Sequence, residues 1–104
     1  MAKKNPIRTA QSEKYHGDEW WSWSVWIDAP LATLRAIASV EYTLHPTFNN
    51  PVRIVKTRST KFKLSSAGWG VFPIHIRVTM RDGREQQLRH QLKLHYPSGE
   101  GNTA

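Results

Sequence analysis

The 104-residue chain has no cysteine, and none of its uncharged apolar runs approaches the length of a membrane-spanning helix. Without cysteine it has neither a disulfide framework nor a cysteine-ligated zinc site. Its first ten residues, MAKKNPIRTA, include basic residues but no apolar segment of the kind a secretory signal requires. We therefore expect a soluble, intracellular protein with no membrane partner, no cofactor and no metal ion.

The sequence also lacks the signatures of common catalytic sites. Its five histidines do not follow metal-ligand spacing, there is no HExxH motif, and the carboxylates are scattered singly. Gly68 and Gly70 flank an aromatic residue and precede an expected strand, whereas a phosphate-binding loop precedes a helix. We expect no catalytic residue and interpret the chain as a non-enzymatic binding protein.

Acidic residues are scarce. Eight Asp and Glu face 15 Lys and Arg, which gives a net charge of +7. A basic surface favours acidic partners such as nucleic acid or an acidic protein segment, but the charge alone names none of them. The same lysines and arginines are equally compatible with solvated faces of ordinary strands.

The length suits one domain. Residues 1–17 are polar and without periodicity, and residues 98–104 are rich in small and polar side chains. We expect both segments to be flexible and residues 18–97 to form the folded unit.

Apolar residues between these ends mostly alternate with polar ones, as in strands with one buried face. An Asp-Gly pair at 82–83 separates two such runs and predicts a hairpin. The expected strands cover residues 20–27, 40–44, 52–55, 61–64, 74–81 and 86–96, with a short helical turn at 31–38. So many short antiparallel strands predict an all-β protein, an immunoglobulin-like β-sandwich.

Two segments place aromatic residues in expected loops. The first is LHPTFNNP, which carries Phe48 at a bend, and the second is AGWGVFPI, which carries Trp69 between two glycines. Glycine frees the backbone around Trp69 for close approach to a ligand. The pattern alone is equally compatible with both rings being buried in the core.

The spacing of HPTFNNP and GWGVFPI, together with the WSVWI strand before them, resembles the YEATS domain over residues 23–96. The resemblance implies an immunoglobulin-like sandwich whose loops bind acylated lysine, with acetyl and crotonyl groups favoured. It implies an acylated-lysine peptide or protein as partner. That partner would be a histone tail in the nucleus of a eukaryote, or an unidentified protein in a bacterial cytoplasm.

By this resemblance, Phe48 and Trp69 form the two walls of an aromatic cleft. The Thr47 hydroxyl bonds to the acyl amide, and His45 orients Thr47. These types suit the ligand, because two rings stack on a flat amide while polar groups satisfy its N–H and C=O.

The remaining assignments are supporting ones. Gly68 and Gly70 shape the Trp69 loop, and Phe72 supports the pocket from below. A third pocket aromatic precedes the WSVWI strand, and the sequence leaves open whether it is Trp20 or Trp21.

The alternative hypothesis is a basic domain of the same fold that binds protein or nucleic acid through charged strands and uses the aromatics only as core. A further alternative is a different flat ligand, such as a modified nucleoside or an acyl amide metabolite.

For an acylated peptide, basic residues near the cleft would add affinity for acidic flanks: Arg53, Lys56, Arg58, Lys61 and Lys63.

Overall fold

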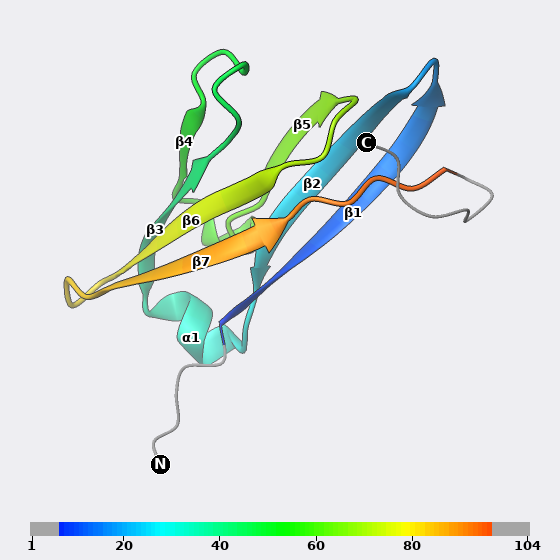
Figure 1. Ribbon diagram of the computed structural model, residues 1–104. Coiled ribbons are helices and arrows are strands. Elements are labelled where there is room, and N and C mark those ends of the chain that lie inside the picture. The colour runs from blue at the N-terminus through cyan, green and yellow to red at the C-terminus, as the bar shows by residue number, and fades with distance from the viewer. Residues whose placement is uncertain (1–6, 97–104) are drawn as a thin grey trace.

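A computed structural model describes residues 7–96, so the expectation for residues 98–104 lies outside the described residues. Two antiparallel sheets pack face to face (Figure 1), with strand orders β1-β2-β5 and β4-β3-β6-β7. In chain order the elements are β1 (Arg8–Gly17), β2 (Trp20–Asp28), α1 (Leu31–Arg35), β3 (Ile37–Thr43), β4 (Val52–Val55), the 3-10 helix η1 (Arg58–Thr60), β5 (Leu64–Gly68), β6 (Pro73–Met80) and β7 (Glu85–Gln91). The predicted all-β immunoglobulin-like sandwich is confirmed.

The core lies between the two sheets and follows from strand alternation. Every second residue of β2 is buried from Trp21 to Ile27, and every second residue of β6 from Ile74 to Met80. No polar or charged residue among residues 7–96 is buried. Burial of apolar area between the sheets is therefore the main stabilising term of the fold.

The predicted hairpin is present, and β6 pairs with β7. Gly83 has a φ of +94°, and the Asp82 carboxylate accepts a hydrogen bond from the Arg84 backbone N–H at 3.0 Å. These are the roles that an Asp-Gly turn assigns to its residues. β7 ends at Gln91, earlier than the expected residue 96, because the chain then crosses toward the other sheet.

The expectation that residues 1–17 are flexible is wrong for residues 8–17, which form β1 and pair with the length of β2. The folded unit therefore starts before residue 18. The strand has no apolar alternation because it lies at a sheet edge, and its inward residues Gln11 and Glu13 are satisfied by hydrogen bonds.

Two further boundaries differ from expectation. β5 covers Leu64–Gly68 and not residues 61–64, because Lys61 and Phe62 have φ of 60° and 57°, in the left-handed region. That turn buries Phe62, whose exposed fraction is 1%, and the Tyr42 hydroxyl donates to its carbonyl at 2.6 Å. The helical turn is shorter than the expected 31–38, and β3 already begins at Ile37.

Side chains join the two sheets where β7 faces β1. The His90 ring lies 2.8 Å from both the Thr9 hydroxyl and the Gln11 side-chain oxygen. The Gln11 amide also exchanges hydrogen bonds with the backbone of Lys93, at 2.7 Å and 3.0 Å. Gln11 thus mimics a strand partner and closes this side of the sandwich without a backbone ladder.

The segment after β7 is held along the same side of the sandwich, where β7 faces β1. Leu92 and Leu94 are fully buried, and the Trp21 indole N–H donates to the His95 carbonyl at 2.8 Å. The Tyr96 hydroxyl donates to Glu19 at 2.6 Å, which ties the segment to the turn between β1 and β2.

Burial lowers the pKa of His90, and the positive charge of Lys93 lowers it further. A histidine whose pKa is lower in the folded state takes up its proton more readily when unfolded. We therefore predict that the free energy of unfolding decreases as the pH falls from above about 6.5 through the lowered pKa. Denaturant unfolding across this range measures the slope, and His90→Gln should flatten it. An unchanged slope in His90→Gln would contradict this assignment.

Candidate functional site

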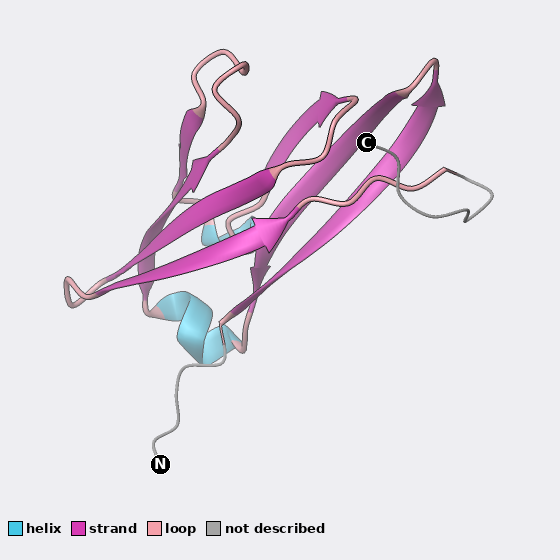
Figure 2. Ribbon diagram, viewed as in Figure 1, coloured by secondary structure: helices cyan, strands magenta, loops and turns pink. Residues whose placement is uncertain are grey.

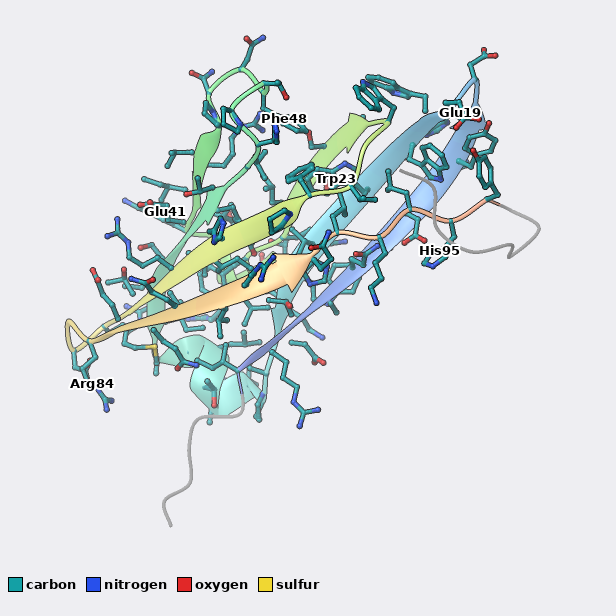
Figure 3. All side chains as sticks on the ribbon, viewed as in Figure 1. Glu19, Trp23, Glu41, Phe48, Arg84 and His95 are labelled. Atoms are coloured by element: carbon teal, nitrogen blue, oxygen red, sulfur yellow. The ribbon has the colours of Figure 1, made fainter. Side chains whose placement is uncertain are left out.

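Three connections meet at one end of the sandwich: the β1–β2 turn, the β3–β4 loop and the β5–β6 loop (Figures 1 and 2). Helix α1 and the β6–β7 turn lie at the opposite end. Figure 3 places Phe48 and Glu19 at the first end and Arg84 at the other. Loops gathered at one end of a rigid sandwich are the usual place for a binding site in this class of fold.

A cavity of about 540 Å³ opens between the β3–β4 loop, the β5–β6 loop and the start of β2. All seven residues that the sequence predicted for the site line it: His45, Thr47, Phe48, Gly68, Trp69, Gly70 and Phe72. The lining is mainly aromatic and aliphatic with a few polar groups, which is typical of sites for small, largely uncharged ligands. We call this cavity the cleft.

Phe72 forms the floor of the cleft and is nearly buried. Its ring centroid lies 5.3 Å from that of Phe48, 6.1 Å from Trp23 and 6.1 Å from His45. Trp23 is buried, and its indole nitrogen has no hydrogen-bond partner within the described chain. Burying this N–H unpaired costs about 1–3 kcal/mol of folding free energy, which burial of the apolar ring offsets. Tilted and edge-to-face packing of these rings connects the cleft rigidly to the core.

Two tryptophans line the cleft from the side of the three-stranded sheet. Trp69 is 65% exposed and Trp20 is 46% exposed, so neither ring is a core residue. Trp21 pairs with Gly68 in the ladder and is fully buried. Of the two candidates for the third aromatic, Trp20 is the one at the cleft, because strand alternation turns Trp21 inward.

Local hydrogen bonds shape the β3–β4 loop. The Leu44 N–H donates to the Pro51 carbonyl at 2.8 Å and closes the loop, and the Phe48 N–H donates to the His45 carbonyl at 3.0 Å. His45 Nδ1 lies 2.9 Å from the Thr47 hydroxyl and accepts from the Thr47 N–H at 3.2 Å. The contact by which His45 was expected to orient Thr47 is therefore present.

Arg53 of β4 holds the far side of the same loop. Its Nε donates to the Asn50 carbonyl at 2.6 Å and its Nη2 donates to the Asn49 carbonyl at 2.9 Å. Asn50 has a φ of +50°, a conformation that asparagine tolerates better than most residues. The guanidinium thus fixes two successive carbonyls just after Phe48 and is not directed at a peptide flank.

The glycines of the cleft act differently from expectation. Neither Gly68 nor Gly70 has a positive φ, so the loop does not need their conformational freedom. A methyl group on Gly68 would lie 3.9 Å from the Phe48 ring, and one on Gly70 would meet nothing within 4 Å. Their contribution is the open space beside Phe48 and Trp69.

Within residues 7–96 no group of three or more His, Asp or Glu side chains gathers as metal ligands would. His45 is the ionisable residue that lines the cleft. In the same described part of the chain, no helix is long and apolar enough to cross a membrane. The cleft therefore offers stacking surfaces and a few hydrogen-bonding groups.

Sequence reasoning missed three lining residues: Asn49, Ala67 and Val71. Asn49 and Val71 directly follow assigned residues within the two motifs, and that adjacency was the available signal. Ala67 directly precedes the assigned Gly68 in the second motif, so the same adjacency was available for it.

Fold and cleft define an immunoglobulin-like binding domain with an aromatic site at its loop end. The chain belongs to the prokaryotic YEATS domain family, whose model matches residues 21–93.

Two of the curated relatives are yeast proteins. The Protein AF-9 homolog of Schizosaccharomyces pombe is 30% identical over 86% of this chain and 43% of its own length. The Protein AF-9 homolog of Saccharomyces cerevisiae is 39% identical over 57% of this chain and 26% of its own length. The chain thus spans less than half the length of these relatives.

Solved YEATS structures have the same fold. The Yaf9 YEATS domain bound to H3K27ac matches with a TM-score of 0.70 and 22% identity, covering 97% of this chain and 84% of that one. The Yaf9 YEATS domain recognising an H3K122suc peptide matches with a TM-score of 0.68 and 24% identity, covering 90% of this chain and 80% of that one. At these identities the likeness establishes the fold.

We predict that Arg53→Gln loosens the β3–β4 loop, because one amide cannot hold both carbonyls as a guanidinium does. Amide NMR spectra should show the largest shifts at residues 45–50, with the unfolding midpoint little changed. Arg58→Gln, in η1, is the matched control and should leave these resonances in place. Equal shifts across all strands would mean that Arg53 serves general stability instead.

Proposed function

We propose that this domain is a non-catalytic reader of acylated lysine, and that the cleft receives the acyl amide. The observation that carries the proposal is the exposure of Trp69 and Trp20 at the rim of an apolar cavity whose floor is Phe72. Large exposed aromatics of this kind mark binding sites, since burial would otherwise stabilise them. The acylated H3 peptides of the Yaf9 structures support the same ligand class.

The hydrogen bonds of His45 support our proposal for the role of Thr47. Because the Thr47 N–H donates to His45 Nδ1, that nitrogen carries a lone pair, and the nearby Thr47 hydroxyl donates to it as well. The hydroxyl oxygen then remains an acceptor. It suits the N–H of an acyl amide, while the Trp69 backbone N–H is our candidate donor to the acyl carbonyl.

The lining also supports the proposal that the cleft excludes unmodified lysine. No Asp or Glu among residues 7–96 lines the cleft, so a free ammonium would lose its hydration without gaining a counter-charge from these residues. An acetyl or crotonyl amide carries no charge, and the planar crotonyl group extends the stacking surface. Two ring contacts and two hydrogen bonds, less the cost of ordering a peptide, give a Kd of about 10–500 μM.

The family that matches supports a choice between the two partners expected from the sequence. The model that matches is the prokaryotic one, so we propose a cytoplasmic protein bearing an acylated lysine as partner. A histone tail would take that place if the source is eukaryotic.

We predict that Trp69→Ala weakens binding of a crotonyl-lysine peptide at least about tenfold, because it removes one stacking wall. Trp26→Ala is the matched control, since Trp26 lies on β2 outside the cleft lining. Calorimetric titration of both folded variants measures the difference. Equal affinities for the two would exclude Trp69 from the site.

We predict that Thr47→Val weakens binding about five- to tenfold, because it removes one hydrogen-bond acceptor while keeping the shape of the side chain. Thr47→Ser keeps the hydroxyl and should bind within about twofold of the unmodified domain. A valine variant that binds like the serine variant would refute the role of the hydroxyl.

A second candidate function rests on the connection between β4 and β5. Its four cations, Lys56, Arg58, Lys61 and Lys63, are all exposed, and no salt bridge within the described chain involves them. Such a segment suits nucleic acid or an acidic protein. Binding through it would fall steeply with salt and would persist in Trp69→Ala, whereas binding through the cleft would show the opposite pattern.

A further inference from the structure

The outer face of the three-stranded sheet continues directly from the cleft. Strand register aligns Lys14, Ser22 and Ala67 in one row across β1, β2 and β5. Trp20 precedes Ser22 by two residues, and Trp69 follows Ala67 by two residues. By strand alternation Trp20 lies on the same face as this row, and Trp69, one residue beyond the end of β5, lines the cleft with it.

The next row away from the cleft holds three serines, Ser12, Ser24 and Ser65. The hydroxyls of Ser24 and Ser65 lie 2.8 Å apart, and that of Ser22 lies 2.8 Å from the His16 ring. A shallow hollow of about 310 Å³ lies over these two rows. Cleft and hollow thus occupy consecutive rows of the same two strands.

The charged residues that border the hollow are Lys14 and Glu13. Lys14 is exposed, and its side chain makes no hydrogen bond or salt bridge with other residues of the described chain. Glu13 also borders the hollow, but its carboxylate accepts from Gln11 at 2.7 Å and pairs with His95 at 2.6 Å. Asp18 and Glu19 lie in the β1–β2 turn, at the other side of Trp20.

We propose that the hollow is a second subsite, which receives the peptide segment flanking the acylated lysine and favours a carboxylate there. Lys14 supplies the charge, and the serine hydroxyls of Ser22 and Ser24 suit a polar backbone. This inference rests on the proposed function, because the cleft must anchor the acyl-lysine. At about 3.3 Å per extended residue, the row of Lys14 lies roughly two to four residues along the peptide from the anchored lysine.

The experiment uses a neutral Gly/Ser/Ala peptide with one central crotonyl-lysine and a single Asp moved through the positions on each side of it. Affinities are measured for the unmodified domain, for Lys14→Gln and for the control Arg58→Gln, which lies in η1 and does not border the hollow. An exposed ion pair of this kind should tighten binding about two- to fivefold.

The subsite predicts that Asp tightens binding on one side of the crotonyl-lysine and not on the other. The gain should vanish in Lys14→Gln, persist in Arg58→Gln and disappear at about 0.5 M NaCl, where screening is strong. The Asp-free peptide should bind all three proteins alike.

If the affinity is the same for every position of the Asp, or if the gain in affinity survives in Lys14→Gln, the subsite is overturned while the proposal for the cleft stands. A gain lost in Arg58→Gln instead assigns the carboxylate to the β4–β5 connection and also overturns it. Failure of the Asp-free crotonyl peptide to bind any of the three proteins overturns the proposed function, and the subsite with it.

Discussion

The packing of the Phe72 ring against Trp23, Phe48 and His45 is the contact on which the site depends. It joins both sheets, since Trp23 belongs to β2 and the other residues flank β3 and β6. The core therefore sets the positions of two loops directly, at centroid distances of 5.3 to 6.1 Å. A rigid floor lets a small domain hold an exposed cleft without long ordered loops.

The remaining walls are held by contacts that lie outside the core. Arg53 fixes the carbonyls behind Phe48, and the Tyr96 hydroxyl bonds to Glu19 in the turn that precedes Trp20. Polar anchoring of this kind is local and directional, whereas apolar packing fixes the sheets as a whole. The cleft thus combines a floor set by the core with walls set by hydrogen bonds.

Much of this arrangement could be predicted from the sequence, because alternating residues of β2 and β6 and the Asp-Gly turn encode their structure locally. β1 could not, since its inward residues Gln11 and Glu13 are polar and find partners such as Lys93 only in the folded chain. The choice between Trp20 and Trp21 also required the register with Gly68. The role of Arg53 depends on loop carbonyls whose direction no pattern of side chains reveals.

The most direct test of the account is a two-dimensional amide NMR titration of the folded domain with a crotonyl-lysine peptide and its unmodified twin. We predict shifts concentrated in residues 45–50 and 68–72 and at the Trp20 indole, with the acylated peptide alone. Unchanged spectra at millimolar acylated peptide, or equal shifts with both peptides, would contradict the claim that this cleft reads acyl-lysine.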